Sequence, residues 1–585
     1  MVLGPVPDEM EGPSMTIPAD LARWIDRADA RYQDELAALA TDETAYQNAF
    51  FQELEFGTAG LRGILGAGPN RMNIHTVGKA TQGLANYLNA TVEGHIPRVA
   101  LARDSRNCGE EFCNVVAEVL AANHIECCMY ERIEPTPALS WATRYQHCDA
   151  GICMTASHNP AEYNGYKVYG ADGCQITSEA AKAIQDAINA VDIFDGVKRI
   201  AFKRAVEERL AFWNGEEVLD NFIEAVYQQS LEAPEALKDL SVVYTPLNGT
   251  GLECVTRIFD RIGMKNVTVV PEQAQPDGNF PTCPYPNPEI RQALERGLAL
   301  CQKVKPDLLV ATDPDADRTG IAVAHEGEYV LLTGNEVGAL LLDYECSKAE
   351  ERGEDLRDKV CVSTIVSSVM CDLMAEERGF EMRRVLTGFK YIGEQIGLLE
   401  AAGEADRYLF GFEESYGYLA GTHVRDKDAI VTSMLIVQMA AWHKAQGRDL
   451  VQAMEALYER YGWWKNSTIS VSFPGAAGAA TMKALMAGLR ATAPTEVAGL
   501  PVTAVIDFAT AAPMPVFGGR GNSAPQTLPS ANVLELQLEG GHKLIIRPSG
   551  TEPKVKAYCF VKGSDPDQAT ALLTSIEAAA RQLLA

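Results

Sequence analysis

The sequence predicts an α/β protein of four domains: three α/β units with mixed sheets, followed by a small C-terminal α+β domain. The chain has 585 residues, which is enough for roughly three to four domains. Short apolar strands alternate with helical segments in three successive rounds, a rhythm typical of βαβ units around a largely parallel sheet. After Gly462 strands come first and a helix follows, which indicates an α+β domain.

The three rounds begin near Pro97, Leu240 and Val360. Helical segments separate the strands of each round, and a long apolar helix starting at Ala429 ends the third. The main strands expected are 98–102, 125–130 and 151–154 in the first round, 240–244 and 307–311 in the second, and 360–365, 383–386 and 408–410 in the third.

The last part of the chain contains a linker rich in Ala, Gly and Pro at 474–513, which surrounds one helical stretch. Strands are expected at 533–539, 542–547 and 554–561, and a final helix begins at Pro566. The resulting division is an N-terminal extension at 1–50 and four domains at 51–210, 211–325, 326–462 and 463–585.

The chain is strongly acidic, because 79 Asp and Glu against 51 Lys and Arg give a formal charge of −28. Such a surface would be repelled by phosphate backbones, so a general nucleic-acid-binding role is disfavoured. A small anionic substrate can still be held by a few local cations. The longest apolar stretch, 429–442, is too short to span a bilayer and contains Gln438, so no membrane partner is expected.

Cysteine usage and the N-terminus indicate a cytoplasmic protein. The 14 cysteines are scattered without CxxC pairs at zinc-site spacing. Residues 1–15 are acidic and Pro-rich, with no secretory signal. We therefore expect reduced cysteines that act as small buried hydrophobic residues.

The first segment that carries chemistry is 151–160, Gly-Ile-Cys-Met-Thr-Ala-Ser-His-Asn-Pro. An apolar strand runs into a polar loop, which places Ser157 just beyond the carboxyl end of a strand, where open α/β sheets bind ligands. An ordinary turn is the alternative. A Ser-His hydrolase is disfavoured, because the adjacent Ser157 and His158 do not normally face each other and no glycine flanks the serine.

Three aspartates, Asp313, Asp315 and Asp317, alternate in a tight loop at the end of another apolar strand. These carboxylates repel one another without a cation, and hard oxygen ligands of this kind suit Mg²⁺. An EF-hand is excluded, because Arg318 and Ala324 occupy the positions where that loop needs Gly and an acid. A solvated acidic turn is the alternative.

A third segment, 411–417, places Glu413, Glu414 and Ser415 directly after a strand. Two carboxylates beside a hydroxyl make a hydrogen-bonding edge suited to the hydroxyl groups of a sugar. A helix N-terminus with acidic residues in its first turn explains the same residues equally well.

The fourth segment, 547–554, gathers cationic and hydroxyl side chains around a glycine. Gly550 allows the backbone to approach a ligand closely, so the loop can form an anion cradle without a P-loop. A plain hairpin turn is the alternative. The donors are Arg547, Ser549, Thr551 and Lys554.

Two shorter segments each add one cation. Residues 56–63 form a glycine-rich stretch containing Arg62, and residues 387–390 place Lys390 after a strand. Neither segment is specific by itself.

Together these six segments resemble one family, the α-D-phosphohexomutases, which include phosphoglucomutases and phosphomannomutases. The resemblance covers about 56–558 and is most specific at 155–160 (Thr-Ala-Ser-His-Asn-Pro), 164–167 (Asn-Gly-Tyr-Lys) and 313–318 (Asp-Pro-Asp-Ala-Asp-Arg). It implies a four-domain architecture, with three α/β mixed-sheet domains and a small C-terminal α+β domain around a central cleft.

The resemblance implies a phosphosugar mutase that interconverts glucose 1-phosphate and glucose 6-phosphate through a phosphoserine enzyme. Mg²⁺ would be the cofactor, and glucose 1,6-bisphosphate the activator and intermediate. Ser157 would be the phosphoserine and would share the metal with Asp313, Asp315 and Asp317, while Arg62 and Lys167 flank the phosphoryl group and Lys167 or Lys390 serves as general base. Implied substrate-binding residues are Arg318, Glu413, Ser415 and, for the non-reacting phosphate, Arg547, Ser549, Gly550, Thr551 and Lys554.

One departure from the family leaves the sugar open. Many members carry Gly-Glu-Glu-Ser-Gly-His in the sugar loop, whereas residues 412–417 are Phe-Glu-Glu-Ser-Tyr-Gly. This loop is similar to a branch that holds bacterial phosphoglucomutases, phosphopentomutases and glucose-1,6-bisphosphate synthases. Phosphopentomutase, phosphomannomutase and glucose-1,6-bisphosphate synthase activity are therefore alternatives. A histidine that acts near the reacting hydroxyl in some members is replaced here by Phe389 and Lys390.

Two other classes of function are disfavoured. A binding protein that kept the fold without catalysis does not need an intact serine, aspartate triplet and phosphate cradle. A phosphatase or phosphonomutase does not need to grip a second phosphate some 390 residues beyond the serine. The sequence is compatible with a monomer or a dimer.

Overall fold

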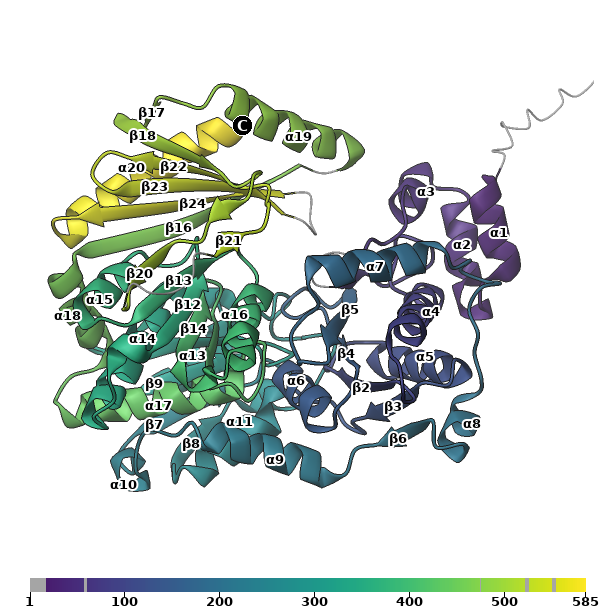
Figure 1. Ribbon diagram of the computed structural model, residues 1–585, viewed down its shortest axis with the longest axis horizontal. Coiled ribbons are helices and arrows are strands. Elements are labelled where there is room, and N and C mark those ends of the chain that lie inside the picture. The colour runs from purple at the N-terminus through teal and green to yellow at the C-terminus, as the bar shows by residue number, and fades with distance from the viewer. Residues whose placement is uncertain (1–16, 57–59, 474, 521–525, 550–553) are drawn as a thin grey trace, which may run out of the picture.

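The structure is a computed structural model that describes residues 17–56, 60–473, 475–520, 526–549 and 554–585 (Figure 1). The N-terminal stretch 1–15 and the predicted cradle residues Gly550 and Thr551 lie outside the described residues. Four large sheets follow one another along the chain, so the predicted class of three α/β units plus a C-terminal β-rich unit is confirmed. Among the described residues, no helix combines the length and apolar character needed to cross a bilayer.

The first sheet has the strand order β1-β5-β4-β2-β3-β6 and is buried on both faces. Alternate residues of its central strands pack against α4, α5 and α7 on one face and against α6 on the other, which is why these strands are apolar throughout. The elements are β1 (Leu61–Ile64), α4 (Ile74–Thr91), β2 (Arg98–Arg103), α5 (Gly109–Ala122), β3 (Glu126–Met129), α6 (Thr136–Tyr145), β4 (Ala150–Met154), β5 (Tyr163–Gly170), α7 (Ser178–Asn189) and β6 (Ala211–Trp213).

The second sheet has the order β11-β10-β9-β7-β8, in which β7, β8 and β9 are parallel and a β9-β10-β11 meander is antiparallel. Residues of α11 pack on one face and those of α13 on the other. The elements are α9 (Glu216–Tyr227), β7 (Ser241–Thr245), α11 (Gly251–Arg261), β8 (Asn266–Val269), α13 (Arg291–Val304), β9 (Leu308–Thr312), β10 (Thr319–His325) and β11 (Glu328–Leu332).

The third sheet has the order β15-β14-β12-β13-β20. Its helix α17 was predicted to be a buried helix, and it is apolar on all sides and buried over nearly its whole length, with Asp428 capping its first turn. The elements are α14 (Gly334–Glu351), β12 (Val360–Thr364), α15 (Met370–Arg378), β13 (Glu381–Val385), α16 (Phe389–Ala401), β14 (Tyr408–Glu413), β15 (Gly417–Ala420), α17 (Ala429–Ala445), α18 (Leu450–Tyr461) and, from the C-terminal part, β20 (Val516–Gly518).

The fourth sheet is antiparallel, with the order β16-β24-β23-β22-β18-β17, and it stands above the third sheet in Figure 1. The stretch 474–513, expected to be a linker around one helix, holds that helix but also two strands of this sheet. The elements are β16 (Trp463–Ser472), α19 (Gly475–Ala491), β17 (Glu496–Val497), β18 (Leu500–Asp507), β22 (Leu534–Leu538), β23 (His542–Pro548), β24 (Lys554–Gly563) and α20 (Pro566–Leu584), with a small hairpin of β19 (Ala512–Pro513) and β21 (Thr527–Leu528).

The strand β20 ties the C-terminal part of the chain to the third sheet. It pairs antiparallel with β13, and the Arg384 N–H donates to the Pro515 carbonyl at 2.9 Å just before the paired residues. Arg520 extends the contact through an ion pair with Asp358 at 2.6 Å. We call residues 512–520 the strap.

The N-terminal extension contains three helices, α1 (Ala19–Arg27), α2 (Gln33–Leu39) and α3 (Glu43–Phe50). They pack beside the first sheet through an apolar cluster that includes Trp24, Phe50 and Phe194 (Figure 1). The cysteines have free thiols and are buried as predicted, except Cys108, which is exposed, and Cys113, which is half-buried.

Candidate active site

The predicted loops from all four parts of the chain meet around one cavity of about 520 Å³. Several of these loops follow the end of a strand, and other lining residues lie on strands, such as Arg62 on β1 and Arg547 on β23, so the sheets deliver polar side chains to a shared space. Predicted site residues that line the cavity are Arg62, Arg318, Glu413, Ser415, Arg547, Ser549 and Lys554. Residues that line it and that the sequence analysis did not single out include Tyr285, Asn287, Glu289, Thr468, Ser470 and Lys556.

Ser157 lies in the floor beside this cavity, after β4. Its φ is +54°, a left-handed conformation that is uncommon for a residue with a side chain and that concentrates at functional sites. Its hydroxyl donates to Asp313 Oδ2 at 2.9 Å, which joins the serine loop to the aspartate loop. The side chain is almost fully buried.

His158 faces Ser157, so the expectation that these neighbours point apart is wrong. The positive φ at Ser157 turns the chain and leaves His158 Nδ1 3.1 Å from Ser157 Oγ. Burial lowers the pKa of His158 well below its usual value, and nearby Arg318 and Arg62 act in the same direction. The imidazole beside the serine is therefore neutral.

Arg106, which the sequence did not reveal as a site residue, binds the backbone of the loop at 157–160, the serine loop. Its guanidinium is buried and donates to the carbonyls of Ser157 at 2.6 Å and Pro160 at 2.8 Å, and also to the carbonyl of Asn159. Asp104 pairs with it at 3.3 Å and accepts from Thr155. The signal was a pair of charges, Asp104 and Arg106, directly after a strand, in the same position as the other site loops.

The three aspartates form the one group in the described parts of the chain with the geometry of a metal site. Their ligand oxygens lie within 4.8 Å of one another, and all three side chains are buried. Asp315 Oδ1 and Asp317 Oδ1 are buried without a hydrogen-bond partner among the described residues. Burial and the two neighbouring carboxylates raise the pKa of Asp313 well above its usual range. A divalent cation with oxygen preference fits this donor set.

Two buried lysines balance the aspartates. Lys167 Nζ lies 2.8 Å from Asp315 and 3.2 Å from Asp317, and Lys427 Nζ lies 3.3 Å from Asp317. Lys427, another residue missed from the sequence, also pairs with Asp426 at 2.8 Å. Gly417 makes room for it, because a Cβ there would stand 2.1 Å from the Lys427 side chain. Lys427 thus comes from the third part of the chain to a loop of the second.

The aspartate loop is bonded through its backbone to the other sheets. The Asp315 carbonyl accepts from the N–H of Thr136 in α6 at 2.9 Å, and the Ala316 carbonyl accepts from Ala429 in α17 at 3.2 Å. The Thr319 N–H donates to the carbonyl of Tyr416, in the loop between β14 and β15, at 3.0 Å. These bonds fix three loops in one arrangement.

The strand β14 ends in Glu413, whose carboxylate accepts from the Gly388 N–H at 2.8 Å. Burial and the adjacent Glu413 raise the pKa of Glu414 to about 7, and Glu414 accepts from Thr364 Oγ1 at 3.2 Å. Ser415 follows at the cavity wall. Carboxylate oxygens and a hydroxyl are therefore available in one short segment.

Cations dominate the other wall of the cavity. Arg547, Lys554 and Lys556 come from β23 and β24 of the fourth sheet, with Ser549 between them. Two more cations line the cavity beside the serine and aspartate loops: Arg62 on β1 donates to Asn159 Oδ1 at 3.0 Å, and Arg318, the residue after Asp317, pairs with Glu289 at 2.7 Å. The wall is suited to an anion although the whole chain is acidic.

Lys390 is not brought to this cavity. It is buried at the start of α16 and lines a separate cavity with Tyr391, Glu394 and Gln526. Its Nζ has no hydrogen-bond partner among the described residues, and burial lowers the pKa of its ammonium. Lys167, the other lysine predicted as general base, is engaged with the aspartates.

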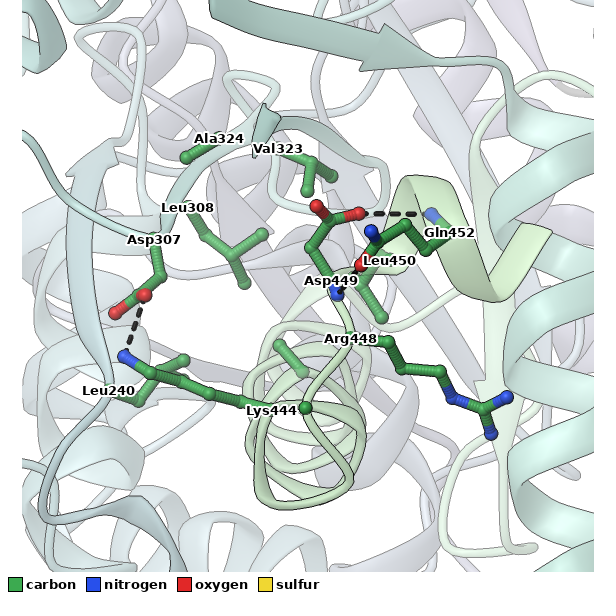
Figure 2. A pocket seen from close by; sticks show the side chains of 12 residues that line it. Leu240, Asp307, Leu308, Val323, Ala324, Lys444, Arg448, Asp449, Leu450 and Gln452 are labelled. Carbon is green, nitrogen blue, oxygen red and sulfur yellow. Dashed lines mark hydrogen bonds and ion pairs between the residues drawn. The ribbon is translucent and has the colours of Figure 1, made fainter. Parts of the chain in front are cut away.

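A further cavity of about 310 Å³ lies between the second sheet and the turn from α17 to α18, and no predicted site residue lines it (Figure 2). Its apolar lining includes Leu308, Val323 and Leu450. Lys444 near the end of α17 pairs at 2.7 Å with Asp307, which precedes β9, and Asp449 caps α18 (Figure 2).

Comparisons with known proteins match these features. Three family models, described as alpha/beta/alpha domains I, II and III of phosphoglucomutase/phosphomannomutase, match residues 53–193, 220–327 and 333–461 in order. A phosphoglucomutase of Staphylococcus epidermidis is 35% identical over 538 residues, covering 92% of this chain and 95% of the relative. One of Staphylococcus aureus is 34% identical over 564 residues, covering 94% and 97%.

Solved structures share the fold at low identity. The chain resembles a putative phosphomannomutase of Thermus thermophilus with a TM-score of 0.67 and 21% identity, covering 91% of this chain and 99% of that one. It also resembles parafusin, a phosphoglucomutase of Paramecium, with a TM-score of 0.65 and 16% identity, covering 91% and 95%. With three family models matched in order and relatives this similar along most of its length, the chain belongs to the α-D-phosphohexomutase family of phosphoglucomutases and phosphomannomutases.

Proposed function

We propose that the protein is a phosphosugar mutase that interconverts glucose 1-phosphate and glucose 6-phosphate. The observation that carries the proposal is one cavity bordered by a buried serine at an aspartate triplet on one side and a cationic wall on the other. The reaction needs both, because the enzyme moves one phosphate while it holds the other. The curated relatives at about a third identity are named phosphoglucomutases, which supports glucose as the sugar.

Ser157 is the proposed carrier of the phosphoryl group. The bond between its Oγ and phosphorus breaks as phosphorus bonds to a sugar hydroxyl oxygen, and the hydroxyl proton passes to a base. The resulting glucose 1,6-bisphosphate turns over in the cavity and returns its other phosphoryl group to Ser157. No phosphate is gained or lost in a complete turnover.

Asp313, Asp315 and Asp317 would hold the proposed metal, Mg²⁺, next to the group carried on Ser157. Bound there, it offsets negative charge on the transferring group. Lys167 is next to the same carboxylates and adds positive charge at that point. Arg62, at the cavity wall beside Asn159, is placed to do the same from the other side.

His158 is the proposed base for the hydroxyl proton. It lines the cavity, and its ring nitrogen lies 3.1 Å from Ser157 Oγ, within reach of groups that react there. Lys167 and Lys390 stay predictions for this role: Lys167 is engaged with two aspartates, and Lys390 lines another cavity.

The proposed substrate-binding residues line the same cavity. Glu413 and Ser415 would hold the sugar hydroxyls, and Arg318 would join them when it exchanges its partner Glu289 for substrate. Arg547, Ser549, Lys554 and, in addition, Lys556 would hold the non-reacting phosphate. Gly550 and Thr551 stay predictions, as does the cytoplasmic location.

The test is a coupled assay for glucose 6-phosphate formed from glucose 1-phosphate, with and without added glucose 1,6-bisphosphate. We expect activity that the bisphosphate increases. Mannose 1-phosphate and ribose 1-phosphate run in parallel should react more slowly. A faster reaction with ribose 1-phosphate would show that the preferred substrate is a pentose phosphate. Release of inorganic phosphate without isomerisation would show that the protein is a phosphatase and not a mutase.

A further inference from the structure

We propose that Tyr285 is the stacking surface on which the sugar ring of the bisphosphate rests while the molecule turns over, which keeps the intermediate in the cavity. This inference rests on the proposed function. The juxtaposition behind it is an exposed aromatic ring at the wall of a cavity whose other prominent groups are charged.

Tyr285 is unusual in its exposure. Its side chain is 61% exposed, more than any other large apolar side chain exposed among the described residues. It nevertheless lines the same cavity as Arg62, Glu413 and Arg547. An aromatic ring left open to solvent inside a ligand cavity indicates a surface that a ligand covers.

The backbone around Tyr285 is rigid although its ring is open. Prolines at 284, 286 and 288 fix the local backbone. The Tyr285 carbonyl accepts from the Asn287 N–H at 2.7 Å and from the buried thiol of Cys283 at 3.1 Å. The loop also packs tightly on β10, since a Cβ on Gly320 would stand 2.7 Å from the Pro288 carbonyl. The ring is thus offered from a fixed base, which reduces the entropy lost on binding.

The chemistry of the turnover requires such a surface. The hydrogen bonds that the Glu413 carboxylate accepts and that the Ser415 hydroxyl makes depend on the direction of each sugar hydroxyl, so they must break when the bisphosphate reverses. The face of an aromatic ring attracts the C–H face of a sugar in either orientation of the bisphosphate. Dispersion and apolar contact do not depend on which way the sugar is turned over the ring. Tyr285 can therefore hold the sugar during the interval in which the directional bonds are broken.

Loss of this hold has a measurable consequence. When the bisphosphate escapes, it carries away the phosphoryl group that Ser157 donated, and the enzyme is left with a free serine hydroxyl. That enzyme is inactive until added glucose 1,6-bisphosphate phosphorylates it again. The number of turnovers completed before inactivation therefore reports how well the intermediate is retained.

The experiment follows glucose 1-phosphate conversion by phosphorylated enzyme without added bisphosphate. Intact-mass analysis of Ser157 phosphorylation and assay of released glucose 1,6-bisphosphate accompany it. We expect Tyr285→Ala to complete about tenfold fewer turnovers before inactivation, to release correspondingly more bisphosphate, and to regain its rate when bisphosphate is added. Tyr285→Phe keeps the ring and should behave as the wild type. The matched control is Tyr145→Ala, which removes a half-exposed ring stacked on Trp141 in α6, outside the cavity.

Each contrary result has a distinct meaning. Unchanged turnover number and bisphosphate release in a folded Tyr285→Ala protein would overturn the inference, and so would a lower rate that bisphosphate does not restore. A Tyr285→Phe protein as leaky as Tyr285→Ala would assign the effect to the hydroxyl and overturn it as well. A wild type inactive on glucose 1-phosphate would overturn the proposed function and this inference with it.

Discussion

Three residues with side chains and a positive φ stand in the three loops at the floor of the site: Ser157 at +54°, Ala316 at +47° and Tyr416 at +65°. Such conformations cost about 1–3 kcal/mol each and persist where surrounding bonds impose them. Two of the bonds that hold these conformations are between backbone groups: the Ala316 carbonyl accepts from the Ala429 N–H, and the Tyr416 carbonyl accepts from the Thr319 N–H. At the residue scale, the site is built from local strain held by contacts between distant segments.

The sequence predicts those site residues that stand in a recognisable local pattern, such as a polar loop directly after an apolar strand. Ser157 and the aspartate triplet follow apolar strands and have recognisable spacing. Lys427 was missed because it acts on Asp317, far away in sequence. Arg106 follows an apolar strand as the other site residues do, but its role in holding the carbonyl of Ser157 shows only in the fold. The backbone turn that brings His158 to Ser157 also has no signature in residue types.

Arg547→Ala is expected to lower kcat/KM on glucose 1-phosphate by about one to two orders of magnitude, mainly through KM. It removes a charge-assisted phosphate contact worth about 1.5–3 kcal/mol that persists from ground state to transition state. The measurement is steady-state kinetics with circular dichroism as a check of folding. Arg490→Ala is the control, since Arg490 pairs with Asp507 in the same part of the chain outside the cavity. An unchanged kcat/KM would place the phosphate contact elsewhere.

Glu134→Gln should flatten part of the pH dependence of stability. Burial, with Glu253 adding to it, raises the pKa of Glu134 to about 8, above its value in the unfolded chain. The folded state therefore binds a proton that the unfolded state has lost, so stability falls by about 1.4 kcal/mol per pH unit as pH rises from about 4.5 to about 8. Glutamine carries no such proton.

Thermal unfolding at several pH values tests this. The Tm difference between Glu134→Gln and the wild type should move in favour of the variant as pH rises across that window. The exposed Glu93→Gln serves as control. Parallel Tm profiles for Glu134→Gln and wild type would show that Glu134 is ionised in the folded protein.

At the element scale, loops at strand ends carry the chemistry and strands set their positions. The sequence predicted the buried apolar strands but missed β5, whose residues 163–170 include Asn, Gly and Lys, and the strands within 474–513. Lys167 is buried on β5 only because Asp315 and Asp317 come from another sheet to pair with it. A polar strand of this kind has no apolar pattern until its partners are known.

The aspartate loop predicts dependence on a divalent metal. Treatment with EDTA should abolish mutase activity, and Mg²⁺ should restore it better than Ca²⁺, because Mg²⁺ imposes tighter octahedral geometry on a transferring phosphoryl group. Asp315→Asn should raise the Mg²⁺ concentration needed for half-maximal activity, since it removes one compensating charge. Full activity in metal-free buffer would contradict the assignment.

The strap is expected to position the cationic wall. In an antiparallel pair, hydrogen-bonded positions alternate with positions that are not hydrogen-bonded. The Arg384 N–H donates to the Pro515 carbonyl, so Phe517, two residues further along and paired with Met382, is also at a hydrogen-bonded position. Phe517→Pro removes that N–H and should raise KM for glucose 1-phosphate several-fold, whereas Phe517→Ala keeps the N–H and serves as control. Equal KM values for the two variants would show that the pairing of β20 does not position Arg547.

At the scale of the whole molecule, the chain forms four large sheets whose residues share one cavity. The predicted domain bounds stay a prediction, and β6 at 211–213 and β11 at 328–332 pair with sheets on the far side of those bounds. The sequence could not show that β20 of the C-terminal part joins the third sheet, because three residues carry little pattern. The clustering of positive charge is also visible only in the fold. A chain with a formal charge of −28 gathers Arg62, Arg547, Lys554 and Lys556 around one cavity, so the local field suits a phosphate where the net charge does not.

The central claim is that Ser157 carries the phosphoryl group that moves. The most direct measurement incubates the protein with glucose 1,6-bisphosphate labelled in its phosphates, locates the label by peptide mass analysis, and then adds unlabelled glucose 1-phosphate. The account predicts label on Ser157 alone, complete transfer of that label to sugar phosphate within the turnover time, and no label on Ser157→Ala. An active protein whose label sits on another residue, or which acquires none, would contradict it.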